Sequence, residues 1–246
     1  MAELRRGRAT KVLGIIPARG GSKGVPRKNL VQIAGEPLLA YAIRAGQESQ
    51  RLTSLCVSTE DGEIGALAGS MGCSVVWRPQ ELAEDSVPIV LAMEHALRVE
   101  EKDHGAFDLI VLLQPTSPIR TGGDIDKATQ IMLEEPNADS LISVICVDDA
   151  HPGRMYHLKR GTWLEPLEPQ AEQESRQDLP KIYYRNGAIY ACRADLLRGS
   201  GRLIGKRRLA FVMKAEWSIN IDEAYEVAQA DELVRRWKEA GCPSAS

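Results

Sequence analysis

Residues 15–29 read IIPARGGSKGVPRKN, and they constrain the architecture more than any other part of the chain. The apolar run Val12–Ile16 predicts a short buried strand that leads into a loop with three glycines, two arginines and two lysines. Glycine lets backbone N–H groups turn toward a ligand without a Cβ in the way, and the cations supply charge for a polyphosphate. The loop is therefore predicted to hold phosphate, the alternative being a turn-rich surface loop. The spacing of Gly20, Gly21 and Gly24 fits neither a P-loop nor a dinucleotide-binding fingerprint.

Strand-like and helix-like segments alternate along the chain outward from this loop. Strands are predicted at 12–16, 55–58, 75–77, 109–113, 141–147, 188–192 and 209–213, and helices at 37–49, 63–71, 87–101, 124–134 and 223–238. This order predicts an α/β fold with a mainly parallel sheet flanked by helices. Ligands of such sheets bind at the carboxyl ends of the strands, which is where the glycine-rich loop is expected.

The pattern predicts one domain over residues 11–240, with a flexible segment at 1–10 and a frayed tail at 241–246. From 148 to about 185 the alternation breaks in an irregular stretch rich in proline, glutamate and glutamine. Such a stretch is too long for an ordinary connection, and long insertions are often functional or interfacial.

Composition and charge exclude several classes of protein. The net charge of the 246 residues is −3, but residues 1–28 hold eight Lys or Arg and one acid, so this segment carries +7 and the remainder −10. An acidic body argues against a nucleic-acid partner. No apolar run approaches the roughly 20 residues that span a bilayer, and no secretory leader is recognised, so the expectation is a cytoplasmic protein without a membrane partner. The odd number of scattered cysteines predicts reduced thiols and no zinc site.

Polar clusters follow three further predicted strands. Residues 114–121 read QPTSPIRT, and their two prolines should fix Gln114 and Arg120 in place. Residues 176–190 include RQDLP and NGAIY, and residues 217–222 read WSINID. On a strand, Asn220 and Asp222 would face the same way and offer oxygen ligands for Mg²⁺; Asp222 could also N-cap the last helix, which would not exclude a metal role.

Together, these motifs resemble the CMP-sialic acid synthetase (acylneuraminate cytidylyltransferase) family. The likeness covers about residues 11–238 and rests on 16–29, 112–121, 176–190 and 218–222 in that order. It implies a Rossmann-like nucleotidyltransferase fold with a small dimerisation insertion. It also implies a homodimer with shared active sites. The implied reaction uses CTP and Mg²⁺ to convert a nine-carbon 2-keto sugar acid, sialic acid or a related nonulosonic acid, into its CMP-sugar and pyrophosphate.

The resemblance also implies roles for individual residues. Arg19, Lys23 and Asp222 match catalytic positions; Gly20, Gly21, Ser22, Lys28, Asn29 and Arg78 match nucleotide contacts; Gln114, Arg154, Arg176 and Tyr190 match sugar contacts; and Asp222 with Asn220 matches the Mg²⁺ site.

The chain departs from the family pattern mainly on the sugar side. Asn220 replaces a frequent aspartate, Arg154 a lysine and Tyr184 an arginine, and a polar residue found near Ile89 is missing. Arg185 is one position from that family arginine, and on a regular strand it would point to the opposite face. Two alternatives remain open: a CTP-dependent transferase for another sugar acid such as KDO, and a nucleotide-binding relative without catalysis.

Overall fold

A computed structural model describes residues 9–147 and 149–246, and within them a seven-stranded sheet forms the centre of the molecule. Its strands lie in the order β11-β7-β10-β6-β1-β4-β5. Their bounds are β1 Val12–Pro17, β4 Ser54–Thr59, β5 Ser74–Trp77, β6 Leu109–Leu112, β7 Ser140–Val147, β10 Ile182–Arg193 and β11 Arg208–Met213. β10 runs antiparallel to β6 and β7, and the other neighbouring pairs of this sheet are parallel. The predicted mainly parallel sheet is confirmed.

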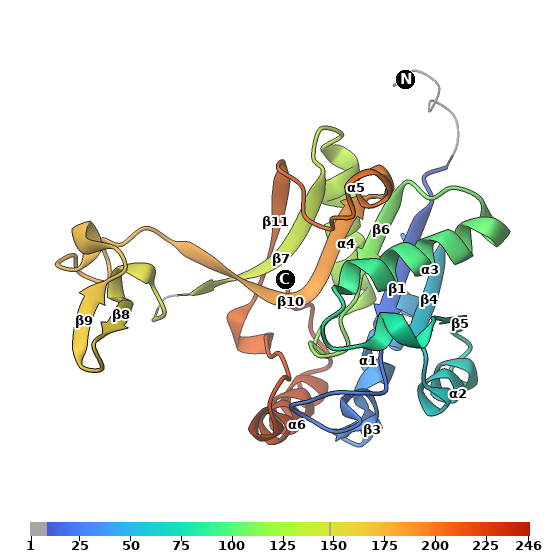
Figure 1. Ribbon diagram of the computed structural model, residues 1–246, viewed down its shortest axis with the longest axis horizontal. Helices are drawn as coiled ribbons and strands as arrows, with labels where there is room; N and C mark the ends of the chain where they lie inside the picture. The colour runs from blue at the N-terminus through green and yellow to red at the C-terminus, as the bar shows by residue number, and fades with distance from the viewer. Residues whose placement is uncertain (1–8, 148) are drawn as a thin grey trace.

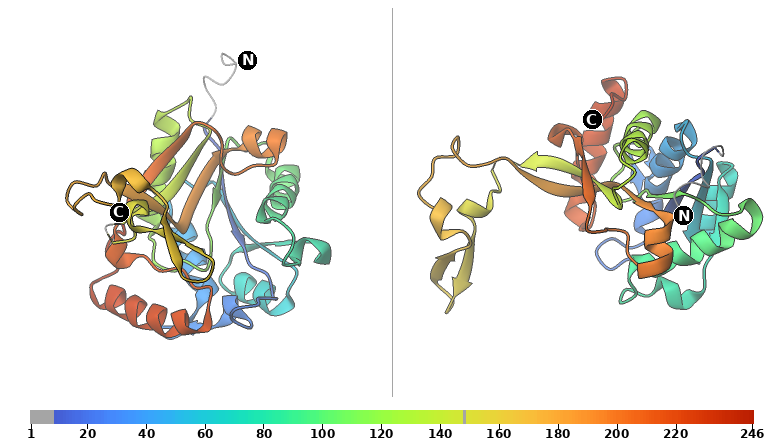
Figure 2. Two further views of the ribbon diagram at one scale, coloured as in Figure 1. Left: turned by 60° about the vertical axis from the view of Figure 1, so that its left-hand side comes forward. Right: turned by 90° about the horizontal axis from the view of Figure 1, so that it is seen from above.

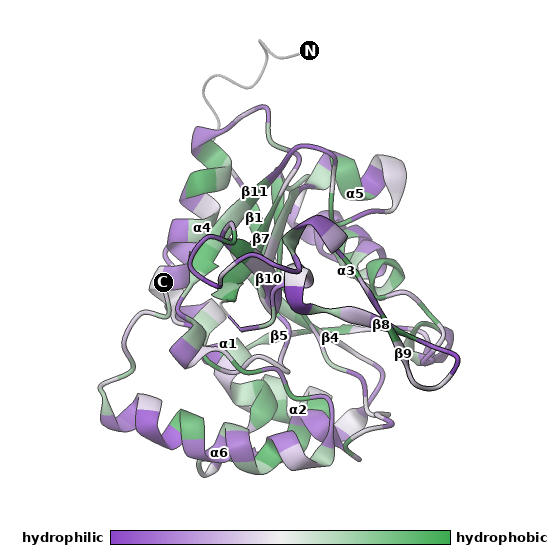
Figure 3. Ribbon diagram, turned by 90° about the vertical axis from the view of Figure 1, so that its left-hand side faces the viewer, coloured by the Kyte–Doolittle hydropathy of each residue, from purple (hydrophilic) through white to green (hydrophobic). Residues whose placement is uncertain are grey.

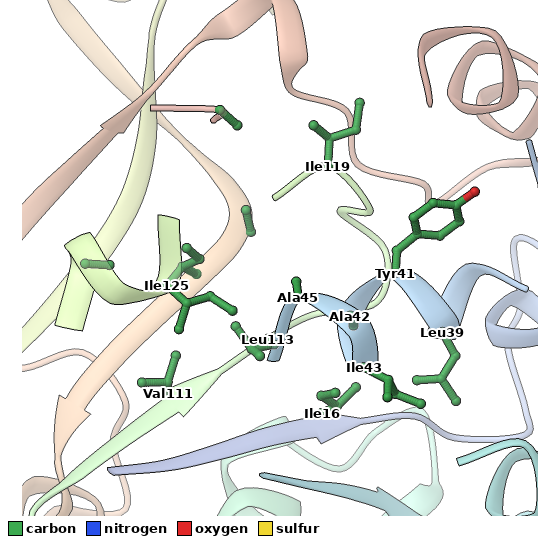
Figure 4. Packing of buried hydrophobic residues seen from close by; sticks show 14 of the residues in the cluster. Ile16, Leu39, Tyr41, Ala42, Ile43, Ala45, Val111, Leu113, Ile119 and Ile125 are labelled. Carbon is green, nitrogen blue, oxygen red and sulfur yellow. The ribbon is translucent and has the colours of Figure 1, made fainter. Parts of the chain in front are cut away.

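Helices cover both faces of this sheet (Figure 1). One core packs under α1 (Leu38–Glu48), α2 (Gly62–Ser70), α4 (Gly122–Glu134) and α6 (Ala224–Glu239). The other packs under α3 (Ile89–His104) and α5 (Ala194–Ser200). Figure 4 shows Ala42 and Ile43 of α1 above Ile16 of β1, with Val111 of β6 close by. In Figure 3, α6 alternates hydrophobic and hydrophilic patches, as expected of a helix that covers a core on one side only.

Strand β1, which leads into the glycine-rich loop, is buried on both of its faces. Val12 and Ile16 belong to one core, whereas Leu13 and Ile15 belong to the other, and each is at most 2% exposed. A strand buried on both faces reads as a continuous apolar run, which is the pattern that the sequence shows. The short strands β2 (Gln32–Ile33) and β3 (Glu36–Pro37) then form a hairpin before α1.

A slender arm projects from the body on the extended ends of β7 and β10 (Figures 1 and 2). It contains the hairpin of β8 (Tyr156–Lys159) and β9 (Trp163–Pro166), so the segment predicted to be irregular has a small sheet of its own. β10 begins at Ile182, six residues before the predicted strand, because residues 182–185 pair with β7 although none of the four is buried. Without a core beside them, they lack the apolar pattern on which the prediction relied.

The prediction of a frayed tail at 241–246 is wrong. Ala245 is fully buried, and its carbonyl accepts a 2.6 Å hydrogen bond from the Lys214 N–H. Ser244 Oγ donates to Asp124 Oδ1 at 2.6 Å, and Trp237 Nε1 donates to the Pro243 carbonyl at 2.9 Å. The short side chains of this tail gave no sign of these contacts, of which that of Ser244 is with α4. The predicted flexible segment 1–10 lies outside the described residues except for 9 and 10.

Of the helices in the described part of the chain, none has both the length and the apolar character needed to cross a bilayer.

Candidate active site

A cavity of about 670 Å³ lies at the carboxyl ends of β1 and β6. After β1 the chain builds β4 and β5 on one side, and it then returns to build β6 on the other side, so the strand order reverses here. Crevices at such switch points are the usual ligand sites of open α/β sheets. Ten of the predicted site residues line the cavity: Arg19, Gly21, Ser22, Lys28, Asn29, Arg78, Gln114, Tyr190, Asn220 and Asp222. Gly20, Lys23, Arg154 and Arg176 are not among its lining residues.

The glycine-rich loop is fastened to the segment that contains Asp222. Lys28 Nζ donates to the Ile221 carbonyl at 2.7 Å and lies 3.1 Å from Asp222 Oδ1. At Gly24 the two backbones approach so closely that a Cβ would lie 2.0 Å from the Asp222 carbonyl oxygen. Asn29 closes the loop from within by donating to the Arg19 carbonyl at 2.9 Å. The candidate phosphate loop and the candidate metal ligands therefore form one wall.

Two cations of this loop share a carboxylate that sequence reasoning missed. Asp85 lies 2.5 Å from Arg19 Nη2 and 3.1 Å from Lys23 Nζ. The hydrogen bond from Lys23, together with the positive charge of Arg19, holds the pKa of Asp85 below its usual value. Lys23 is 82% exposed at the rim. A phosphate entering the cavity would compete with Asp85 for both cations.

Glu60 links Arg78 to the glycine-rich loop, and it too was missed. Its Oε2 accepts hydrogen bonds from Arg78 Nε at 3.0 Å and Nη2 at 2.9 Å, while Oε1 accepts the Gly20 N–H at 2.7 Å. The two side chains are only 8% and 4% exposed, so this is a buried ion pair. Arg78 also lines the cavity, so its hydrogen bonds to Glu60 fix the orientation of the Arg78 guanidinium toward a ligand.

The loop that contains Gln114 is held by Arg120, which is almost fully buried. Its Nη1 donates to the carbonyls of Gln114, Ser117 and Ala188 at 2.9, 2.7 and 3.0 Å. Desolvation lowers the pKa of Arg120 to about 9. Gln114 is thus held in place, as predicted, although a buried guanidinium contributes to this beside the two prolines.

Asn220 and Asp222 lie in an extended segment outside the strands, yet their side chains meet. Asn220 Nδ2 donates to Asp222 Oδ2, and Ser117 Oγ donates to Asn220 Oδ1 at 3.3 Å. The alternative that Asp222 N-caps α6 is wrong: Glu223 is the N-cap and forms a capping box with Glu226. The Asp222 carboxylate is therefore directed at the cavity, where Lys28 and Asn220 contact it.

The donor set here fits Mg²⁺ that is held together with a phosphate. In the described ranges 9–147 and 149–246, no group of three or more His, Cys, Asp or Glu could hold a metal ion. Mg²⁺ commonly takes one or two protein carboxylates and fills its remaining positions with water and substrate phosphate. One carboxylate and one amide oxygen beside a cationic phosphate loop meet that requirement.

Tyr184 and Arg185 both line the cavity. They pair with the neighbouring residues Ile145 and Val144 of β7, so they face opposite sides of the sheet, as predicted. The pairing then shifts between Arg185 and Tyr190, and this irregularity puts Arg185 on the face of Tyr190. Arg154 and Arg176 are exposed in the arm, and Arg176 Nη1 pairs with Asp149 at 2.8 Å.

Residues 13–229 match the sequence profile of the cytidylyltransferases. The chain belongs to the cytidylyltransferase family. It is 31% identical over 215 residues to the N-acylneuraminate cytidylyltransferase of Escherichia coli O18:K1:H7 (strain RS218 / NMEC), covering 87% of this chain and 50% of that protein. It is 29% identical over 241 residues to the CMP-N,N'-diacetyllegionaminic acid synthase of Legionella pneumophila subsp. pneumophila, covering 94% of this chain and 99% of that protein.

A solved structure shares the fold of this cytidylyltransferase. CMP:2-keto-3-deoxy-manno-octonic acid synthetase complexed with CTP superposes with a TM-score of 0.70 at 16% identity, covering 92% of this chain and 99% of that one. The chain spans about half the length of the first curated relatives that it matches. The resemblance to the CMP-sialic acid synthetases and the nucleotidyltransferase fold are both confirmed.

Proposed function

We propose that this cytidylyltransferase activates a nine-carbon 2-keto sugar acid with CTP. The sugar's anomeric oxygen would attack the α-phosphorus and lose its proton as the new P–O bond forms. The bond to the β-phosphate oxygen would break, and pyrophosphate would leave. The observation that carries this proposal is the cavity, which the glycine-rich loop, Asp222, Gln114 and Tyr190 line together.

The loop side suits the nucleotide. Arg19 and Lys23 would exchange Asp85 for phosphate oxygens and stabilise the charge that builds on the departing pyrophosphate. Ser22 and the amides of Gly20 and Gly21 would join them. Lys28 and Asn29 would hold phosphate and ribose, and Arg78 would approach the cytosine. Catalysis would then consist mainly of positioning and charge neutralisation.

Asp222 and Asn220 would hold Mg²⁺ against the phosphates, and the ion would supply positive charge to their oxygens. Lys28 forms an ion pair with Asp222, so a positively charged side chain lies directly beside the proposed Mg²⁺ site. An uncharged Asn220 offers a weaker second ligand than the aspartate that is frequent in the family.

A second copy of the chain would complete the sugar side. The arm exposes Leu158, Trp163 and Leu164, which are 64%, 71% and 62% exposed. An apolar surface of this kind on a projecting hairpin suits burial against a partner. Arg154 and Arg176, which lie in the same arm, would reach the sugar in the partner's cavity. A mixture of Arg19→Ala and Arg176→Ala copies should then regain activity that neither variant has alone, because half of the sites in each mixed dimer are intact.

The location is proposed to be the cytoplasm. The thiols of Cys56, Cys73, Cys192 and Cys242 are free, as expected in a reducing compartment.

The deciding experiment measures pyrophosphate release from CTP and Mg²⁺ with N-acetylneuraminic, legionaminic, pseudaminic and KDO acids in parallel. Turnover with one nine-carbon acid, lost in Arg19→Ala, is the expected result. Turnover with KDO alone would favour the eight-carbon alternative. CTP binding without turnover of any acid would favour the non-catalytic relative.

A further inference from the structure

We infer that Arg185 binds the carboxylate of the sugar acid and thereby selects acidic sugars. This inference rests on the proposed function and deepens it.

The irregularity in β10 places Arg185 on the same face as Tyr190. Residues five apart on a regular strand face opposite sides. Here Arg185 pairs with Val144 and Tyr190 with Ile142, and these two partners lie two residues apart on β7. Directly paired residues of antiparallel strands share a face, as do residues two apart, so Arg185 and Tyr190 face the same way.

Local anchors hold this arrangement. Gly187, in the irregular stretch, has φ +79°, a conformation that favours glycine. Asn186 is buried, and its Oδ1 accepts a 2.6 Å hydrogen bond from Ser143 Oγ of β7. The backbone that follows Arg185 is thus anchored to β7.

Arg185 is the cation of the cavity whose charge is still available. Four cationic side chains of the described residues line it. Arg19 pairs with Asp85, Lys28 with Asp222 and Arg78 with Glu60. For Arg185, which is exposed, no carboxylate partner is found among the described residues. Its charge nevertheless acts on the site: burial raises the pKa of Tyr190, and the Arg185 guanidinium opposes that rise.

A guanidinium in this position matches the acceptor that we propose. Guanidinium groups bind carboxylates through two parallel hydrogen bonds, which fix orientation as well as position. In a cyclised 2-keto acid, the carboxylate and the anomeric hydroxyl are attached to the same carbon. A clamp on the carboxylate therefore aims the attacking oxygen.

The test compares Arg185→Gln and Arg185→Lys with the wild type and with Arg208→Gln. Arg208 is an exposed arginine at the start of β11, at the end of the sheet remote from the cavity. Arg208→Gln is the control because it removes one positive charge without touching the site. We expect Arg185→Gln to raise the KM for the sugar acid about 10- to 100-fold, the range for a charge-assisted hydrogen bond. The Kd for CTP, from calorimetry, should stay within about twofold. Arg185→Lys should be intermediate, and Arg208→Gln unchanged.

An acceptor whose carboxylate is replaced by a carboxamide makes the assignment specific. The wild type should lose affinity for this amide, whereas Arg185→Gln should bind acid and amide equally. Equal acid binding by wild type and Arg185→Gln, or a parallel loss of CTP affinity, would overturn the inference. Acid binding is also measured by calorimetry with CMP present. If the wild type released no pyrophosphate, the proposed function would fail, but the binding measurement would still test the role of Arg185.

Discussion

At the scale of single residues, the phosphate loop is neutralised before any substrate arrives. Asp85 occupies Arg19 and Lys23 together. Exposed ion pairs are weak, so phosphate oxygens can displace this carboxylate at small cost. We expect Asp85→Asn to lower the Kd for CTP by about two- to fivefold, because the two cations are then unpaired in the free protein.

Isothermal titration of CTP into Asp85→Asn measures this directly. Glu81→Gln, an exposed acid in the same part of the chain, is the control and should bind CTP as the wild type does. An unchanged or higher Kd in Asp85→Asn would show that Asp85 does not compete with phosphate.

Glu60 supports a second prediction at this scale. Because Glu60 is the shared partner of Arg78 and the Gly20 amide, Glu60→Gln should misalign both. We expect the KM for CTP to rise about tenfold and the free energy of unfolding to fall by about 1–3 kcal/mol, as for a weakened buried hydrogen-bonded pair. Steady-state kinetics and urea denaturation measure the two effects. Stability lost without any change in KM would make Glu60 a folding residue only.

Which site residues the sequence predicts depends on where their partners lie. Arg19 and Lys28 follow from the loop itself, since glycine and charge lie side by side in the chain. Asp85 and Glu60 come from separate segments, and no spacing connects a lone acid to a distant cation. Arg185 was set aside because its face was judged against that of Tyr184, whereas the register shift between Arg185 and Tyr190 decides which of the two shares a face with Tyr190.

At the scale of elements, helix α4 ties the C-terminal residues to the sheet. Burial by itself raises the pKa of Asp124, but hydrogen bonds from Ser244 and Thr121 outweigh it and hold the pKa below its usual value. A depressed pKa stabilises the fold above the unfolded-state pKa of about 4, and this contribution disappears as the pH falls through the lower folded-state value. Asp124→Asn should therefore lower the free energy of unfolding by about 1–3 kcal/mol at pH 7.

The pH dependence separates this effect from a general packing defect. The difference between wild type and Asp124→Asn should shrink when urea unfolding is repeated near pH 3, because below about pH 4 the unfolded chain increasingly takes up the proton that the folded carboxylate binds more weakly. Glu134→Gln, at an exposed position of the same helix, should match the wild type at both values. A constant difference from pH 7 to pH 3 would contradict the prediction.

Elements with a core beside them are the ones that the sequence predicts well. β1 and β6 are buried on both faces and read as apolar runs. The start of β10 was missed because none of residues 182–185 is buried, so they lack that pattern. The last six residues were missed for the opposite reason: short polar side chains pack there through hydrogen bonds, which leave no periodicity.

At the scale of the whole molecule, the arm should join two copies. Trp163 is the most exposed of its large apolar side chains. Trp163→Ser should weaken the proposed dimer at least tenfold, because buried aromatic anchors dominate interfaces. Sedimentation velocity over a range of concentrations measures this, with Thr162→Ser as the neighbouring control. The same mass for wild type and Trp163→Ser at every concentration would exclude the arm as the contact.

The strand order also affects how the chain is made. β10 lies between β6 and β7, although both of them precede it in sequence. Until residues 182–193 leave the ribosome, β6 and β7 each have an open edge, the kind of surface through which nascent chains pair with one another. The whole arm must be synthesised during that interval. A pause in translation between codons 148 and 181 is therefore the point at which this protein is most exposed to aggregation and most dependent on chaperones.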